Sequence, residues 1–362
     1  MAIAQFNTLL IREVRPETQD AISVAFEVPE QLREVYRFRQ GQFLTLRARI
    51  DNEELRRSYS VCSSVPEYDS RAELRVAIKR VPDGRFSNWA NDTLRAGESI
   101  DVMTPDGRFN TPLDPTRKRR YLGFAGGSGI TPMLSLIKTT LASEPLSEFT
   151  LVYGNRSVAS IMFVEELEEL KNRYMQRLRL YHVLSDEGQE LQLFHGLLDE
   201  AKCSEIITSL VPATSIDEAF ICGPEPMMNA AEAALTKAGV ETARIHVERF
   251  GVPQAARSAA AVAPAADAPS ADVVLIIDGK ERRLKVPFEG QAILDVGLLA
   301  GADLPYACKG GVCCTCRARV LEGEVRMEKN YTLEDQEMAQ GFVLTCQSHP
   351  VSERVVLSYD ER

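Results

Sequence analysis

Residues 308–316 of the chain read Cys308-Lys-Gly-Gly-Val-Cys-Cys-Thr-Cys316, and Cys346 follows after 29 intervening residues. A C-x4-C-x2-C run with a distant fourth cysteine is a spacing with which four thiolates hold a [2Fe–2S] cluster. A structural zinc ion usually takes two closely spaced pairs of ligands, whereas the fourth cysteine here stands alone. The spacing predicts an iron–sulfur cluster with four ligands: Cys308, Cys313, Cys316 and Cys346. A zinc site is the alternative.

Cys314 is a fifth cysteine inside the same loop. A cluster that used Cys314 in place of Cys313 would break both spacings, so we expect Cys314 to be a thiol that does not bind iron. Five of the eight cysteines fall within the last 55 residues. In a chain without an evident export signal, clustered cysteines are more often metal ligands than disulfides.

The composition is that of a globular protein. Hydrophobic residues make up 44% and charged residues 26%, and 362 residues suffice for two or three domains. No apolar run is long enough for a transmembrane helix, and no signal peptide is visible. The net charge is −10, without the basic patch typical of nucleic-acid binding. We expect a cytoplasmic protein that binds neither nucleic acid nor membrane.

Residues 251–271 read GVPQAARSAAAVAPAADAPSA and contain almost no large apolar side chain. Such a segment cannot bury a core, so we expect a linker there. It separates residues 272–362, a small unit that a metal cluster would stabilise. In that unit we expect strands at 273–277, 283–286, 317–321 and 355–358 and a helix at 292–301.

Two further regions precede the linker. Residues 1–113 contain regularly spaced short strands and turn signals, which favour a barrel or a sandwich. In residues 114–250 strands alternate with helices, which is typical of a parallel sheet with crossover helices. The strands expected in the first region are 9–14, 22–28, 42–48, 58–62, 73–78 and 99–103; in the second region we expect strands at 121–125, 149–153, 178–184, 218–222 and 245–250 and helices at 133–142, 162–174 and 227–238.

A glycine-rich turn, Gly126-Gly-Ser-Gly-Ile-Thr-Pro132, lies between an expected strand and an expected helix. Glycines there let a pyrophosphate approach the helix N-terminus, where free N–H groups and the helix dipole favour anions. Pro132 stands where a G-x-G-x-x-G pattern would have its third glycine. We predict a nucleotide site, with a plain tight turn as the alternative.

Three other motifs are weak in isolation: Arg56-Arg-Ser-Tyr-Ser60, Gly84-Arg-Phe-Ser87 and Cys222-Gly-Pro224. Their order along the chain, with the glycine turn and the cysteine loop, resembles the ferredoxin–NADP reductase superfamily with a C-terminal plant-type ferredoxin domain. Within it the chain is most similar to reductase subunits of bacterial phenylacetyl-CoA epoxidases, for example at 218–224, 245–250 and 303–313. The resemblance implies an antiparallel Greek-key β-barrel for FAD, a parallel α/β domain for NAD(P) and a β-grasp ferredoxin domain.

The resemblance also implies roles in the flavin site. Arg57 would bind the FAD pyrophosphate, Tyr59 would stack on the isoalloxazine, and Ser60 would hydrogen-bond near flavin N5. Phe250 would cover the flavin, and Gln40 stands where related sequences often have proline. A helix start under the pyrophosphate would consist of Gly84, Arg85, Phe86 and Ser87.

For the nicotinamide site, the resemblance implies that Cys222 approaches the nicotinamide C4, so that Cys222 and Ser60 are the expected catalytic residues. Arg156 and Ser185 are candidates to hold a 2′-phosphate, which Asp186 would oppose. The resemblance favours NADPH, with NADH left open. The remaining lining residues would be Gly127, Gly129, Thr131, Gly223 and Pro224.

A nicotinamide gives two electrons as hydride, an iron–sulfur centre takes one at a time, and a flavin bridges the two. We therefore expect an NAD(P)H-dependent reductase that passes electrons through FAD and [2Fe–2S] to a separate oxygenase, expected to be a di-iron phenylacetyl-CoA epoxidase. One alternative client is a Rieske-type ring-hydroxylating dioxygenase. The other alternative is a non-enzymatic ferredoxin-like electron carrier.

Overall fold

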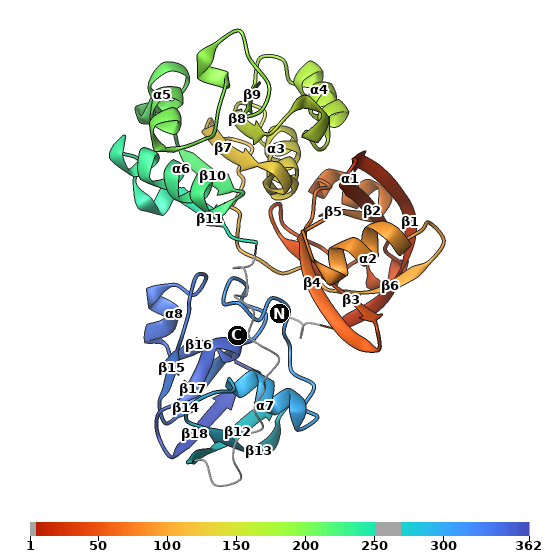
Figure 1. The fold of residues 1–362 in the computed structure, drawn as a ribbon, viewed down its shortest axis with the longest axis vertical. Coiled ribbons are helices and arrows are strands. Elements are labelled where there is room, and N and C mark those ends of the chain that lie inside the picture. The colour runs from red at the N-terminus through yellow and green to blue at the C-terminus, as the bar shows by residue number, and fades with distance from the viewer. Residues whose placement is uncertain (1–4, 251–268, 362) are drawn as a thin grey trace. The chain divides into compact units, whose positions relative to one another are not determined.

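A computed structural model describes residues 5–250 and 269–361 (Figure 1). The chain divides into two compact units, of which one spans Gln5–Arg249 and the other begins at Phe250. The first unit contains an antiparallel barrel and a parallel sheet, and the second contains a mixed sheet and the cysteine loop. Among the described residues, no helix is long and apolar enough to span a bilayer.

The barrel is an antiparallel sheet with the strand order β4-β3-β6-β1-β2-β5. Its two edges meet where Val61, directly after β4, bridges Val76 of β5. Alternate residues such as Leu9 and Ile11 point into the core, as the period of two in a strand requires. The elements are β1 (Phe6–Thr18), β2 (Ala21–Glu27), β3 (Phe43–Ile50), β4 (Glu53–Ser60), α1 (Val65–Arg71), β5 (Glu73–Lys79), α2 (Arg85–Thr93) and β6 (Ser99–Met103).

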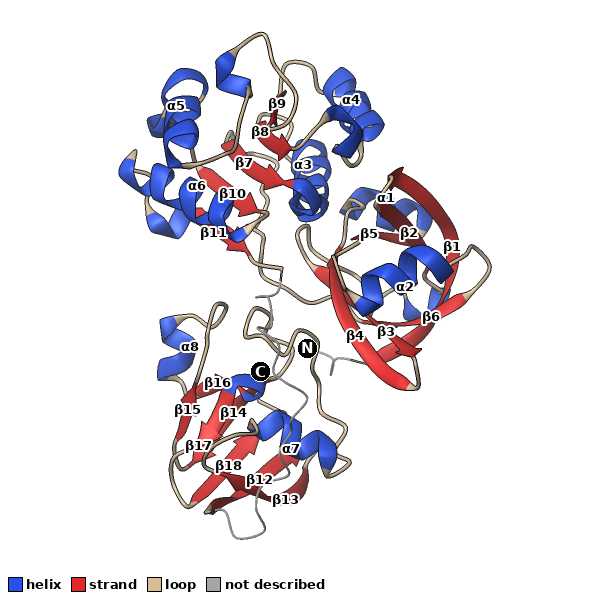
Figure 2. Ribbon diagram, in the orientation of Figure 1, coloured by secondary structure: helices blue, strands red, loops and turns tan. Residues whose placement is uncertain are grey.

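The parallel sheet has the order β11-β10-β7-β8-β9 and carries helices on both faces (Figure 2). Helices α3 and α4 share one buried apolar cluster, and α5 and α6 share another. The chain moves outward from β7 in both directions, so the switch point lies between β7 and β10, where ligands of such sheets bind. The elements are β7 (Arg120–Gly126), α3 (Ile130–Ser143), β8 (Glu148–Asn155), α4 (Val164–Arg173), β9 (Leu178–Leu184), α5 (Glu200–Leu210), β10 (Glu218–Cys222), α6 (Glu225–Lys237) and β11 (Ile245–Glu248).

The C-terminal unit is a five-stranded sheet with the order β13-β12-β18-β14-β16, beside a two-stranded β15-β17 ribbon. The pair β12–β18 is parallel, whereas β12–β13 and β14–β18 are antiparallel. Ile293 and Leu294 of α7 enter the core of this unit. The elements are β12 (Ser270–Ile277), β13 (Lys280–Pro287), α7 (Ile293–Leu299), β14 (Arg317–Glu322), β15 (Val325–Met327), α8 (Asp335–Ala339), β16 (Phe342–Leu344), β17 (Ser348–Pro350) and β18 (Arg354–Ser358).

The predicted fold class is confirmed: an antiparallel barrel, a parallel α/β sheet and a ferredoxin-type sheet follow one another. Helices α1, α5 and α8 and the short strands β15, β16 and β17 were not expected. Of the predicted linker 251–271, residues 251–268 lie outside the described residues. Its last part is corrected, because Ser270 and Ala271 belong to β12, and Ala271 is fully buried.

Candidate functional site

The end of β4 brings three predicted flavin residues together. The Tyr59 ring lies 5.9 Å from the ring of Phe86, centroid to centroid, so β4 and α2 meet here. The Ser60 hydroxyl is buried and has no hydrogen-bond partner. Arg57 is exposed, and its guanidinium donates a hydrogen bond to the carbonyl of Arg56 over 2.7 Å. A buried hydroxyl without a protein partner fits a site that hydrogen-bonds a ligand such as a flavin edge.

The N-terminus of α2 supplies a turn for an anion. Gly84 is the N-cap residue, and no side chain caps the helix, so its first N–H groups stay available. A Cβ at Gly84 would lie 2.6 Å from Ser87 Oγ, so the turn has no room for a side chain. The Ser87 hydroxyl accepts a hydrogen bond from the Val81 N–H over 3.1 Å and thereby fixes the turn. The Arg85 guanidinium instead pairs with Glu53, the first residue of β4.

The turn at Gln40, where the resemblance implies that proline is common, is held in two ways. The Gln40 side chain is buried, and its Nε2 donates a hydrogen bond to the carbonyl of Thr111 over 2.9 Å. The next residue, Gly41, has φ +81°, and a Cβ there would lie 1.9 Å from the Phe109 carbonyl oxygen. The turn is therefore held by a side-chain hydrogen bond and a close backbone contact.

Two turns meet backbone to backbone at the switch point between β7 and β10. A Cβ at Gly129 would lie 2.0 Å from the Cys222 carbonyl oxygen, and one at Gly126 would lie 2.7 Å from Pro224 Cδ. A Cβ at Gly223 would lie 2.9 Å from the Gly126 nitrogen. Glycine is therefore required at positions 126, 129 and 223. The predicted residues of the two turns lie together at one edge of the sheet.

Side-chain hydrogen bonds also fix the first of these turns, Gly126–Gly129. Gly127 has φ +52°, in the left-handed region that favours glycine, and its carbonyl accepts a hydrogen bond from the Tyr153 hydroxyl over 2.9 Å. The buried Thr131 hydroxyl donates to the Ser128 carbonyl over 3.0 Å. The start of α3 therefore presents backbone N–H groups in a fixed arrangement, which suits a pyrophosphate.

Cys222 is fully buried, and burial raises the pKa of its thiol well above the ordinary value. A neutral thiol suits an apolar contact with a ring rather than nucleophilic attack, which needs a thiolate. Glu248 of β11 stands in register beside it. Burial, and then the Asp106 carboxylate, raise the pKa of Glu248 to about 8. Glu248 was not predicted as a site residue, since only the β10–β11 register brings it here.

Arg156 and Ser185 follow β8 and β9, whose ends are neighbours in the sheet. Arg156 is exposed, and its carbonyl accepts a hydrogen bond from the Asp186 N–H over 2.8 Å. The Ser185 hydroxyl donates to the Asp186 carboxylate over 2.6 Å. The candidate cation for a 2′-phosphate and the carboxylate that would oppose it therefore stand side by side.

The remaining predicted flavin residue, Phe250, follows β11 and is 42% exposed.

In the C-terminal unit, the four predicted ligands form two pairs of thiols. The Cys313 thiol lies 3.1 Å from Cys308 Sγ, and the Cys316 thiol donates to Cys346. Among the described residues, no three His, Cys, Asp or Glu side chains converge on one point as a single metal ion needs. Two pairs suit a cluster with two irons, each bound by two thiolates, better than one zinc ion.

The loop also directs backbone N–H groups at sulfur. The Cys313 thiol and the N–H groups of Gly310, Val312 and Cys313 lower the pKa of Cys308 to about 6. Gly311 has φ +77°, and a Cβ there would lie 3.0 Å from the Lys329 carbonyl oxygen. Cys314 Sγ lies 3.3 Å from Thr332 Oγ1. These residues fit an anionic cluster.

Three family comparisons match successive parts of the chain. The oxidoreductase FAD-binding domain matches residues 9–111, the oxidoreductase NAD-binding domain matches 124–233, and the 2Fe-2S iron-sulfur cluster binding domain matches 275–351. The barrel, the parallel sheet and the C-terminal sheet thus each carry a recognised cofactor domain, and the chain is an oxidoreductase.

Relatives share this whole arrangement. The chain is 46% identical to one of the subunits of the 1,2-phenylacetyl-CoA epoxidase of Escherichia coli K12, over 99% of the chain and 98% of the relative. It is 35% identical to the ferredoxin reductase component of 3-ketosteroid-9-alpha-monooxygenase of Rhodococcus rhodochrous, over 97% and 96%. The structure of phthalate dioxygenase reductase is similar with a TM-score of 0.60 and 25% identity, over 98% of both chains. The chain belongs to the family of oxygenase reductase components that join an FAD-binding, an NAD-binding and a 2Fe–2S domain.

Proposed function

We propose that this protein is the reductase subunit of a phenylacetyl-CoA epoxidase and takes its electrons from NADPH. The observation that carries the proposal is the 46% identity to a component of such an epoxidase along nearly the whole of both chains. FAD, when bound, would accept a hydride and release single electrons to the cluster.

The chain's own residues would bind and orient the cofactors. The α2 N-terminus, with Gly84 as its cap, would hold the flavin pyrophosphate, and the Ser60 hydroxyl, which has no protein partner, would donate to the flavin edge. The Gly126–Gly129 turn would hold the coenzyme pyrophosphate beside Cys222. The paired thiols of the cysteine loop would hold the cluster.

The choice of NADPH is supported by Arg156, an exposed cation at the end of β8. A 2′-phosphate needs such a cation, whereas a free ribose hydroxyl suits an acidic residue. The acidic residue at this site is Asp186. If NADPH is the coenzyme, the attraction of its 2′-phosphate to Arg156 has to exceed the repulsion by Asp186. If the repulsion by Asp186 is the stronger, we expect NADH to be the coenzyme.

The test is reconstitution with purified phenylacetyl-CoA epoxidase oxygenase subunits. We expect NADPH oxidation that is coupled to epoxidation of phenylacetyl-CoA. A stoichiometric flavin and two irons per chain are expected in the purified protein. Uncoupled NADPH oxidation without product would contradict the assignment to this oxygenase.

A Rieske-type oxygenase is the second candidate client. It is favoured by the similarity to phthalate dioxygenase reductase over 98% of both chains. The same coupled assay with a Rieske dioxygenase as acceptor distinguishes the two clients. Product formation with the Rieske enzyme alone would favour this second candidate.

We also infer a cytoplasmic location. The described residues include all eight cysteines, and none of them forms a disulfide, as is usual in a reducing compartment. Fractionation of cells that express the tagged protein would test this inference, and recovery from the membrane or periplasmic fraction would contradict it.

A further inference from the structure

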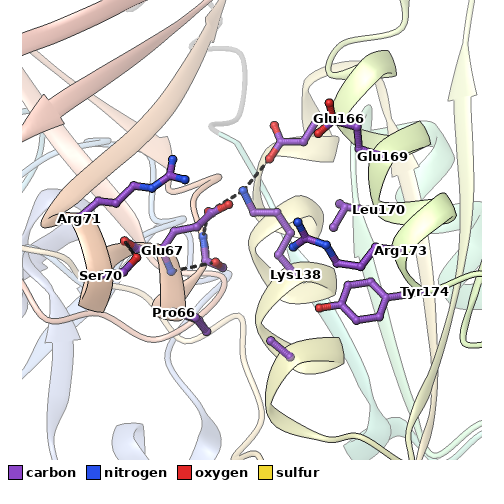
Figure 3. A pocket seen from close by; sticks show the side chains of 12 residues that line it. Pro66, Glu67, Ser70, Arg71, Lys138, Glu166, Glu169, Leu170, Arg173 and Tyr174 are labelled. Atoms are coloured by element: carbon purple, nitrogen blue, oxygen red, sulfur yellow. Dashed lines mark hydrogen bonds and ion pairs between the residues drawn. The ribbon is translucent and has the colours of Figure 1, made fainter.

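A cleft of about 290 Å³ lies between helix α1 of the barrel and helices α3 and α4 of the parallel sheet (Figure 3). Its walls carry charged side chains from both parts, among them Glu67 and Arg71 from α1 and Glu166 and Arg173 from α4. Lys138 of α3 lies between these walls. The cleft is distinct from the switch point of the sheet, where the nucleotide turns meet.

Lys138 is nearly buried, with 8% of its side chain exposed. Its ammonium lies 2.7 Å from Glu67 Oε2 and 2.6 Å from Glu166 Oε1, as Figure 3 shows. A buried ammonium is costly unless it is paired. Burial alone would lower the pKa of Lys138, but the carboxylates of Glu166 and Glu67 outweigh burial and raise it. Lys138 is therefore a charged bridge between α1 and α4.

The neighbouring residue of α3 makes a second contact with α1. The buried Thr139 hydroxyl accepts a hydrogen bond from the Val65 N–H, at the first turn of α1, over 3.2 Å. Glu67 also accepts from the Ser64 N–H over 2.7 Å, which completes the capping box of α1. Consecutive residues of α3 thus hold the first turn of α1, one by charge and one by a neutral hydrogen bond.

Both helices are anchored in the cofactor sites. Ser64, the N-cap of α1, follows Ser60 by four residues, so α1 begins directly beyond the predicted flavin contact. Helix α3 begins at Ile130, directly after the glycine turn, and Lys138 lies eight residues further along. At 1.5 Å per residue this is about 12 Å. A contact between α1 and α3 therefore ties the flavin site to the nucleotide turn.

We propose that Lys138 is a positioning residue whose bridge to Glu67 and Glu166 sets the distance and angle between nicotinamide and flavin. The proposal rests on the proposed function only in assuming hydride transfer from a nicotinamide to FAD. Apolar contacts also join the two parts, since Cys62, Ala77 and Phe109 of the barrel belong to the same buried cluster as α3. Such contacts are not directional, whereas a charged hydrogen bond has a preferred geometry.

The main test compares Lys138→Met with Lys138→Arg, which keeps the charge, in the full chain loaded with FAD and cluster. Stopped-flow absorbance at saturating NADPH measures flavin reduction. We expect the rate in Lys138→Met to fall on the order of tenfold, because small misplacement of reacting atoms is costly. The coenzyme dissociation constant should change by less than about threefold. Lys138→Arg should recover most of the rate.

Hydrogen–deuterium exchange gives a readout that does not depend on activity. Peptides that cover 64–72 should exchange faster in Lys138→Met, because the first turn of α1 has lost its partner. Glu169→Gln is the matched control, since Glu169 lines the same cleft from α4 but is not part of the bridge. Its exchange and its reduction rate should equal those of the parent.

Thr139→Val keeps every charge and is the second test variant, to be used if Lys138→Met does not fold. It should also speed exchange at Val65 and slow flavin reduction, and Thr139→Ser should recover both. Parent-like exchange and reduction rates in a folded Lys138→Met or Thr139→Val protein would overturn the proposal. Failure of the parent to supply the epoxidase would contradict only the proposed client, because flavin reduction needs no oxygenase.

Discussion

At the scale of single residues, Cys314 bears on how four ligands are selected from the five cysteines of the C-terminal unit. Its sulfur lies 3.3 Å from Thr332 Oγ1, and its use in place of Cys313 would break both spacings of the cluster motif. We therefore predict that Cys314→Ala keeps the visible absorption of the cluster and two irons per chain, whereas Cys313→Ala loses them. Absorption spectra and iron analysis of the two purified variants check this. The reverse pattern would mean that Cys314 is the ligand.

The coenzyme choice also depends on single residues. If Arg156 holds a 2′-phosphate, Arg156→Ala should raise KM for NADPH far more than KM for NADH. A charged hydrogen bond is worth about 1.5–3 kcal/mol, which corresponds to roughly a tenfold to hundredfold effect. Asp186→Asn, the matched change on the neighbouring strand end, should improve NADPH relative to NADH. Equal effects of Arg156→Ala on both coenzymes would remove Arg156 from this role.

Glu248 gives a prediction about pH. Burial raises its pKa from 4.5 to about 8, so its neutral form is favoured in the folded state. The stabilisation is present below about pH 4.5 and is lost as the pH rises towards 8. The glutamine in Glu248→Gln does not titrate, so the variant does not lose this stabilisation. The difference between the unfolding temperatures of variant and parent, variant minus parent, should therefore increase from pH 5 to pH 8.

Thermal unfolding at several pH values measures this difference. The exposed Glu190→Gln, in the loop that follows β9 at the opposite edge of the sheet, is the control and should show no such trend. A difference for Glu248→Gln that is constant across this range would mean that Glu248 is already ionised in the folded protein.

At the scale of elements, the two turns at the switch point allow no side chain between them. In Gly129→Ala the new Cβ would lie 2.0 Å from the Cys222 carbonyl oxygen, so β10 or the start of α3 has to move. We expect a lower unfolding temperature and a KM for NADPH that rises at least about tenfold. Gly188→Ala, where an added Cβ has open space, is the control. A parent-like Gly129→Ala would show that the turns do not pack as described.

The sequence carried enough information for the elements with strong local signals. Alternating strands and helices predicted the parallel sheet, and the cysteine spacing predicted the [2Fe–2S] domain, which the family match confirms. Helix α5 has a local signal too, since Asp199 caps it and Cys203, Ile206 and Ile207 lie on its buried face. Strands β15, β16 and β17 have only three residues each, too few for a period to be visible.

The sequence did not predict which residues from distant elements pair in the folded protein. The β10–β11 register, which brings Glu248 to Cys222, depends on how strands align, and no local pattern encodes that alignment. Lys138 is a lysine within an apolar helix, a signal of a buried charge, but its partners come from α1 and α4. The roles of individual site residues stay predictions until the variants above are measured.

At the scale of the whole molecule, the FAD- and NAD-binding domains lie in one compact unit and the 2Fe–2S domain lies in the other. We therefore expect hydride uptake and electron delivery to be separable. Cys316→Ser should lose the cluster but keep FAD, because the predicted flavin residues Arg57, Tyr59 and Ser60 belong to the other unit. The variant should still oxidise NADPH with ferricyanide, which can take electrons from the flavin directly. It should not support turnover of the partner oxygenase, which needs the cluster.

The measurement is NADPH oxidation by parent and variant, side by side, with ferricyanide and with the reconstituted oxygenase. Ser352→Ala is a suitable control, since Ser352 lies in the same unit and outside the cysteine loop. Its hydroxyl accepts a hydrogen bond from the Glu324 N–H and donates one to the Arg354 carbonyl. Ser352→Ala should retain both activities. If a cluster-free Cys316→Ser protein drives the oxygenase at the parent rate, electrons leave the flavin without the cluster, and the order of the two centres proposed here is wrong. If the variant loses ferricyanide reduction as well, the cysteine loop affects the flavin unit, and the two functions are not separable.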